Sequence, residues 1–149
     1  MISNFFDNEI NTVLNDLFSN DIYPIIYSYI NSVEYFSFIK NRCNNGTLAF
    51  LNTRRKDKRW REVNSISELI EGNKFYITCI DSKDKLEPFY NKYKNKYHVV
   101  YSQDIYTKEQ WLEIMPKTAS KSNAILQLKK YLNCDRVVSF GDSVNDTDM

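Results

Sequence analysis

The residues with the clearest chemical potential lie close to the C-terminal end of the chain. Asp142, Asn145 and Asp146 follow directly on the apolar run 137–140. If that run is a buried strand of a parallel sheet, its end places these side chains at the carboxyl edge, where ligands bind in such folds. Their oxygen atoms suit a hard cation such as Mg²⁺, which keeps places for water and phosphate oxygens. Gly-Asp and Asn-Asp are also common turn dipeptides, so a surface turn stays open as the alternative for this stretch taken alone.

A lysine upstream complements these carboxylates. Lys121 stands in the polar segment 117–122, whose serines can cap a helix, and apolar residues recur at helical spacing from there to Leu132. A lysine at the start of a helix offers a phosphate both a point charge and the N–H groups of the helix terminus. The order of loop, helix, buried strand and acidic strand end is one unit of a parallel α/β sheet. The unit indicates chemistry on a phosphate group.

The spacing of these positions resembles a known family. Pro116, Lys121 and the run Gly141-Asp142-x-x-Asn145-Asp146 resemble the third and fourth motifs of the haloacid dehalogenase-like (HAD) superfamily, most closely its Cof-type phosphatases. Glu113-Ile114-Met115-Pro116 matches the strand end that precedes the lysine in that pattern. The resemblance implies an enzyme in which an Asp nucleophile forms an aspartyl-phosphate, a second Asp acts as acid and base, and Mg²⁺ bridges nucleophile and phosphate.

The resemblance also implies roles for residues of this chain. Carried over by position, Asp142 and Asp146 would hold the metal, Lys121 would stabilise the charge of the nucleophile and the phosphate, and Asn145 would orient the loop. The expected cofactor is Mg²⁺. The expected substrates are small phosphate monoesters such as sugar phosphates.

The sequence departs from the family pattern at the nucleophile. The Asp-x-Asp-x-Thr motif is absent, because the only Asp-x-Asp is 146–148, inside the fourth motif. The Gly that usually flanks the lysine is replaced by Ser120 and Ser122. We therefore expect an incomplete chain with little or no phosphatase activity alone, since loss of a covalent nucleophile removes the reaction path itself.

Residues 1–114 show the pattern of an α+β module. We expect a turn at Asn44-Asn45-Gly46, a helix end at Gly72, helices starting at Asp7, Ser65 and Asp84, and strands over 23–29, 33–39, 74–81, 97–102 and 110–114. The resemblance implies that this module is the substrate-selecting cap of a Cof-type protein. The predicted fold class is therefore α/β, with an α+β cap over 1–114 followed by a fragment of a HAD-type Rossmann-like parallel core over 115–149.

The most basic segment of the chain is 54–61. Arg54 and Arg55 are candidate contacts for a phosphorylated substrate, and Trp60 is available for stacking; a solvated connection between elements is the simpler interpretation. A non-catalytic module that binds a phosphorylated ligand or a protein partner through this surface is the alternative function. A nucleic-acid binder is disfavoured, because 20 Lys and Arg against 19 Asp and Glu leave a net charge of +1.

The composition indicates the class of protein and the compartment in which we expect it. A hydrophobic share of 42% and a charged share of 26% are typical of a soluble globular protein. The chain has three widely spaced cysteines, no long apolar stretch and no N-terminal signal pattern, so we expect a cytoplasmic protein without a membrane partner. The expected partner is a small phosphorylated metabolite.

Overall fold

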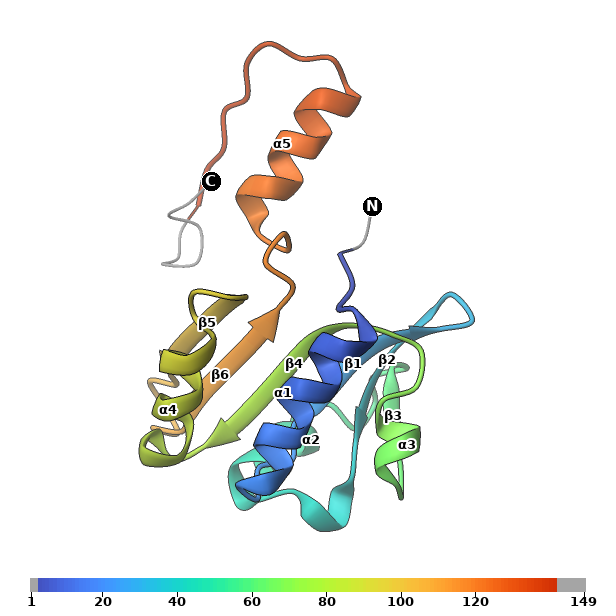
Figure 1. Ribbon diagram of the computed structural model, residues 1–149, viewed down its shortest axis with the longest axis vertical. Coiled ribbons are helices and arrows are strands. Elements are labelled where there is room, and N and C mark those ends of the chain that lie inside the picture. Colours follow the sequence, from blue (N-terminus) through green and yellow to red (C-terminus); the bar gives the residue numbers. More distant parts are fainter. Residues whose placement is uncertain (1–2, 142–149) are drawn as a thin grey trace.

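A mixed six-stranded sheet forms the centre of the computed structural model, which describes residues 3–141 (Figure 1). The strands lie in the order β3-β2-β1-β4-β6-β5, and all neighbours are antiparallel except the parallel pair β2 and β3. Their bounds are β1 Ile25–Ile30, β2 Val33–Phe38, β3 Trp60–Glu62, β4 Asn73–Asp81, β5 His98–Gln103 and β6 Gln110–Met115. The fold is thus α/β, and within the described residues the sheet is mostly antiparallel.

Helices lie on both faces of this sheet. Helices α1 and α4 pack on one face, the smaller helix α2 packs on the other, and α5 extends away from the sheet (Figure 1). Their bounds are α1 Asp7–Ser19, the short 3-10 turn η1 Lys40–Arg42, α2 Asn45–Thr53, α3 Ile66–Leu69, α4 Lys83–Tyr93 and α5 Lys121–Tyr131.

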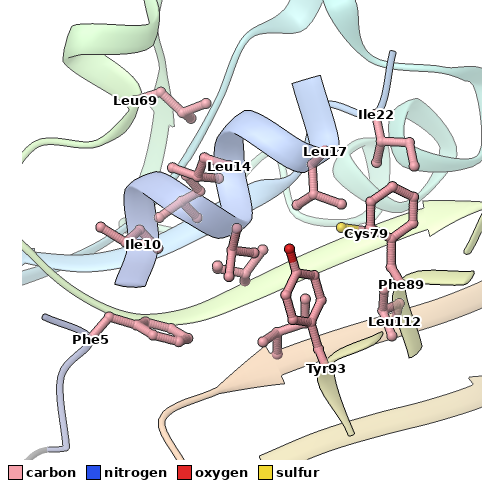
Figure 2. Packing of buried hydrophobic residues seen from close by; sticks show 14 of the residues in the cluster. Phe5, Ile10, Leu14, Leu17, Ile22, Leu69, Cys79, Phe89, Tyr93 and Leu112 are labelled. Carbon is pink, nitrogen blue, oxygen red and sulfur yellow. The ribbon is translucent and has the colours of Figure 1, made fainter. Parts of the chain in front are cut away.

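The main core fills the space between the sheet and helices α1 and α4. Helix α1 contributes apolar residues three and four positions apart, as its sequence pattern predicts, and they meet alternate residues of the central strands. Tyr93 and Phe89 of α4 close the same layer (Figure 2). The least exposed members are Ile10, Val13, Leu17, Ile26, Leu69, Ile77, Cys79, Leu86, Leu112 and Ile114.

A smaller core lies on the opposite face of the sheet. It consists of Ile25, Phe36 and Phe38 from the strands and Leu51 from α2. Trp60 packs edge-on against Phe38, with ring centroids 4.7 Å apart. The tryptophan that the sequence offers for stacking is therefore half-buried and packs against this core.

Most expected elements are present, and two of the differences concern where a helix begins. The Asn-Asn-Gly segment begins α2 instead of forming a turn: the Oδ1 atom of Asn44 accepts a hydrogen bond from the N–H of Thr47 at 2.8 Å. Asn is favoured at helix N-caps and in turns alike, so the local signal does not distinguish them. Helix α4 likewise begins after Ser82, two residues before the predicted cap Asp84.

The chain enters and leaves the sheet at one end. The backbone N–H of Phe5 donates to the carbonyl of Lys74 at 2.9 Å, which places the N-terminal segment beside the start of β4. Thr118, just past β6, donates to Ser3 at 2.9 Å. Figure 1 shows the N-terminal segment and α5 at the same end of the sheet.

The segment after β6 differs from the expectation. Helix α5 forms, but none of its residues is buried, and Leu128 is 55% exposed. The run 137–140, predicted as a buried strand, has no strand conformation, and Phe140 is 90% exposed. A parallel strand needs neighbours to accept its ladder of hydrogen bonds, and no described residue pairs with this run.

Candidate functional site

The residues predicted for catalysis are placed only in part. Lys121 is the first residue of α5 and is exposed, and the Ser120 hydroxyl caps the helix by accepting from the N–H of Asn123 at 3.1 Å. The predicted metal ligands Asp142 and Asp146, and likewise Asn145, lie outside the described residues. Residues 3–141 contain no group of three or more His, Cys, Asp or Glu side chains arranged for a metal ion.

Arg54 and Arg55 sit at the C-terminal end of α2, and both are exposed. The Arg54 guanidinium lies over the ring of Phe50, 5.5 Å from its centroid. The Nε atom of Arg55 donates to the Oδ1 atom of Asn52 at 3.0 Å. Neither arginine has an acidic partner among the salt bridges of the described residues, so both charges are available to an anion in solvent.

Other arginines of the basic segment are neutralised within the fold. Arg59 pairs with Asp57 and with Glu34, each at 2.8 Å, and Arg61 pairs with Glu71. Hydrogen bonds from Arg59 lower the pKa of Asp57 to about 2. Two of the cations in this segment therefore have structural partners, whereas Arg54, Arg55, Lys56 and Lys58 have no acidic partner among the salt bridges of the described residues.

A polar and aromatic group on the sheet is the feature that sequence reasoning missed. The hydroxyl of Tyr76 on β4 donates to the carboxylate of Glu113 on β6. The ring of Tyr27 on β1 lies 4.9 Å from that of Tyr76. All three side chains are half-buried, so solvent reaches them. We name these three residues the tyrosine–glutamate face.

Strand alternation sets the direction of this face. Leu112 and Ile114, on either side of Glu113, are buried against α1 and α4. Because successive side chains of a strand point to opposite faces, Glu113 points away from these helices. In the sequence Glu113 stands between the apolar Leu112 and Ile114, and this local alternation could have identified a carboxylate on the second face of the sheet.

The face has a defined electrostatic character. Burial raises the pKa of Tyr76 above its ordinary value, and the charge of Glu113 and its hydrogen bond raise it further. Burial also raises the pKa of Tyr27, while the positive charges of Arg59 and Arg54 oppose that rise. At neutral pH both tyrosines are therefore neutral hydroxyl donors beside a carboxylate, with arginine charge nearby.

Two hollows lie elsewhere on the surface. One, of about 350 Å³, is lined at the far end of β4 by Asp81 together with Arg42, Cys43 and Lys85, among others. A second, of about 410 Å³, lies between α1 and α4. In the first, Lys85 already faces Asp81 at 3.5 Å, so the charges of this hollow are balanced internally.

Comparison with known proteins gives a consistent result. The sequence model of one family, described as haloacid dehalogenase-like hydrolase, matches residues 3–149. A haloacid dehalogenase-like hydrolase from B. subtilis superposes with a TM-score of 0.72 at 19% identity, over 98% of this chain and 57% of that one. Another from Bacteroides thetaiotaomicron gives a TM-score of 0.64 at 21% identity, over 98% of this chain and 53% of that one. No curated protein sequence gives a significant match.

The solved structures that match are longer than this chain. The chain spans little more than half the length of the two solved structures. Among the residues described here, no helix is long and apolar enough to cross a membrane.

Proposed function

The chain belongs to the haloacid dehalogenase-like hydrolase family, and on this premise we propose that it is part of a Mg²⁺-dependent phosphatase for small phosphate monoesters such as sugar phosphates. The observation that carries the proposal is the spacing of Lys121 and Gly141-Asp142-x-x-Asn145-Asp146 within a family match that includes them. The net reaction adds water to a phosphate monoester and releases phosphate and an alcohol.

We assign residues 1–114 to a cap and 115–149 to a portion of the catalytic core. The support is that the first part has its own two-sided sheet and core, and that the segment directly after it returns to its start, where Thr118 contacts Ser3. A module whose ends meet can be inserted in another domain without distorting it. The exposed apolar residues of α5 fit a helix whose packing partners lie outside the described residues.

Each residue of the proposed centre has a chemical task. The ammonium of Lys121 binds a phosphate oxygen and offsets its negative charge. Asp142 and Asp146 are hard oxygen donors, so the chemistry of this pair fits Mg²⁺, and Asn145 keeps their loop in position. When bound, the metal supplies charge stabilisation to the phosphoryl group.

The nucleophile is not among these residues, because the 149-residue sequence contains no Asp-x-Asp-x-Thr motif. The purified 149-residue chain should therefore release phosphate from an aryl phosphate only at the background rate, with or without Mg²⁺. Mg²⁺-dependent turnover by this chain that disappears in the Asp142→Ala variant would overturn that assignment, since it would place a complete centre within these residues.

A second candidate function is a non-catalytic module that binds a phosphorylated ligand or protein. The availability of Arg54 and Arg55, which have no acidic partner in the described salt bridges, favours it. A salt-sensitive affinity for a phosphorylated ligand that is lost in the double variant Arg54→Gln/Arg55→Gln would support this function. Lys40→Gln is the matched control, because Lys40 already pairs with Glu62 at 3.6 Å. Equal affinity in all three proteins would exclude it.

A further inference from the structure

The tyrosine–glutamate face lies at the end of the sheet where the chain enters and leaves. Glu113 is two residues from the end of β6, and Tyr76 is two residues from Lys74, whose carbonyl accepts the N–H of Phe5. The segment from Met115 to Lys121 starts at this same end. The face therefore lies toward the end of the sheet from which the segment that carries the proposed phosphate-binding lysine departs.

One hydrogen bond holds the carboxylate in place and leaves capacity for more. Tyr76 and Glu113 lie on adjacent strands. Glu113 is directly opposite Thr78, so Tyr76, two residues from Thr78, is its diagonal neighbour on the same face of the sheet. The Tyr76 hydroxyl contacts the Oε1 atom of Glu113. No other hydrogen bond or salt bridge of Glu113 occurs among residues 3–141. An ionised carboxylate accepts about four hydrogen bonds, so most of its capacity is unused.

The carboxylate and the two tyrosine rings favour a ligand with neutral hydroxyl groups and an apolar carbon skeleton. A half-buried carboxylate repels an anionic group placed directly beside it but accepts hydrogen bonds from neutral hydroxyl groups. Its two oxygens can accept from neighbouring hydroxyls of one ligand. The rings of Tyr27 and Tyr76 provide apolar surface beside it. A lining of aromatic rings with a small number of polar groups among them is typical of sites that bind small molecules.

We propose that Glu113, positioned by Tyr76, binds hydroxyl groups of the sugar or polyol portion of a phosphate monoester, while Tyr27 and Tyr76 pack against its carbon skeleton. The proposal rests on the phosphatase function proposed above and adds to it which residues select the leaving group. Glu113 binds the hydroxyls directly, whereas Tyr76 has two roles: its hydroxyl positions Glu113 and its ring contributes apolar contact. The face predicts a neutral, hydroxylated leaving group in preference to an acidic or purely apolar one.

Amide chemical-shift titration of the 149-residue chain tests this site without turnover. The probes are glucose 6-phosphate and n-hexyl phosphate, which share the phosphate and the number of carbons and differ in the hydroxyls of the carbon skeleton. We expect glucose 6-phosphate to shift the amides around Tyr76 and Glu113 with a dissociation constant of about 1–10 mM. Hexyl phosphate should bind there at least about tenfold more weakly, because its alkyl chain would cover the half-buried carboxylate without giving it a hydrogen-bond donor.

Variants separate recognition from folding. Glu113→Gln keeps the size of the side chain and should reduce the preference for glucose 6-phosphate from about tenfold to about onefold. Tyr76→Phe should reduce it partly, because Glu113 remains but loses the donor that positions it. Glu87→Gln is the control: Glu87 lies on α4, pairs weakly with Lys83 at 3.9 Å, and should leave the preference unchanged.

Three results would overturn the proposal. They are equal binding of both probes at the face, an unchanged preference in Glu113→Gln, and no shift near Tyr76 and Glu113 with either probe at about 50 mM, a concentration above the expected dissociation constants. Failure of the phosphatase proposal is recognised separately, by absence of Mg²⁺-dependent phosphate release from the longest native polypeptide that contains residues 1–149, because the titration involves no turnover. A hydroxyl preference without that activity would leave the face as a polyol-binding site.

Discussion

The hydroxyl of Thr118 donates to the hydroxyl of Ser3 at 2.9 Å across 115 positions of sequence. This contact brings the two ends of the α+β unit together, beside the backbone bond from Phe5 to Lys74. One surface hydrogen bond stabilises a fold by only about 1 kcal/mol, so its importance is geometric. The chain thus returns to its N-terminal segment before it reaches Lys121.

The packing of the sheet and of α5 predicts unequal effects of two leucine truncations. Leu112 is fully buried in the main core, whereas Leu128 on α5 is 55% exposed. Leu112→Ala should lower the free energy of unfolding by about 2–5 kcal/mol. Leu128→Ala should lower it by less than about 0.5 kcal/mol. Urea denaturation of both variants provides the measurement, and equal losses would show that α5 packs against the sheet.

Gly72 occupies a position that other residues cannot take without strain. Its φ is +77°, and a Cβ atom there would lie 2.4 Å from the carbonyl oxygen of Tyr29. Gly72→Ala should therefore lower the free energy of unfolding by more than about 1 kcal/mol, measured by thermal or urea denaturation. Gly46→Ala is a useful comparison, because its new Cβ would meet the side chain of Glu109, at 3.0 Å, instead of backbone. A neutral Gly72→Ala variant would contradict the conformation of this turn.

The Asp57–Arg59 pair predicts a pH-dependent contribution to stability. Arg59 lowers the pKa of Asp57 from 3.8 to about 2 in the folded chain. A lowered carboxyl pKa contributes stability that is fully present above the unfolded value and is lost as the pH falls through the folded value. Asp57→Asn should thus be less stable than the parent near about pH 6, and the difference should shrink between pH 3.8 and about 2.

Acid-unfolding curves of the two proteins measure this difference directly. Glu62→Gln is the control, since Glu62 meets Lys40 only at 3.6 Å on an exposed surface. A gap between the parent and Asp57→Asn that stays constant down to about pH 2 would refute the proposed pairing.

The three free cysteines should react at different rates. Cys134 is exposed, Cys43 is half-buried and Cys79 is buried. Burial raises the pKa of Cys43 to about 11, so only about one thiol in a thousand is ionised at about pH 8. Burial also raises the pKa of Cys79. With a thiol-reactive disulfide reagent, Cys134 should react first, Cys43 slowly and Cys79 only after unfolding; equal rates for Cys43 and Cys134 would contradict this burial.

Much of the fold is predictable from sequence because its signals are local. The apolar spacing of α1 predicts its inner stripe, and the capping box at Ser65 predicts the start of α3, where the hydroxyl accepts from the N–H of Glu68 at 3.3 Å. The prediction of a strand over 137–140 was wrong because strand formation depends on neighbouring strands, which a local apolar pattern does not specify. Helix α2 was missed because Asn44 carries the same signal for a cap as for a turn.

The candidate site is less predictable because its contacts join distant parts of the chain. Glu113 meets Tyr76 across 37 positions, and Arg59 meets Glu34 across 25. Sequence spacing predicts Lys121 and Asp142 as site residues through the family pattern, but it could not show which arginines of 54–61 are already paired. Composition gave a net charge without its distribution.

Phosphate release by the longest native polypeptide that contains residues 1–149 tests the central claim most directly. We predict Mg²⁺-dependent hydrolysis of small phosphate monoesters that falls by at least about a hundredfold in Asp142→Asn and in Lys121→Ala. The first substitution weakens the proposed Mg²⁺ site and the second removes a cation, so each reduces the charge stabilisation of the phosphoryl group. Glu87→Gln, on α4, should keep full activity. Absence of phosphate release, or release that is unaffected by Asp142→Asn, would contradict the assignment of this chain to a phosphoryl-transfer centre.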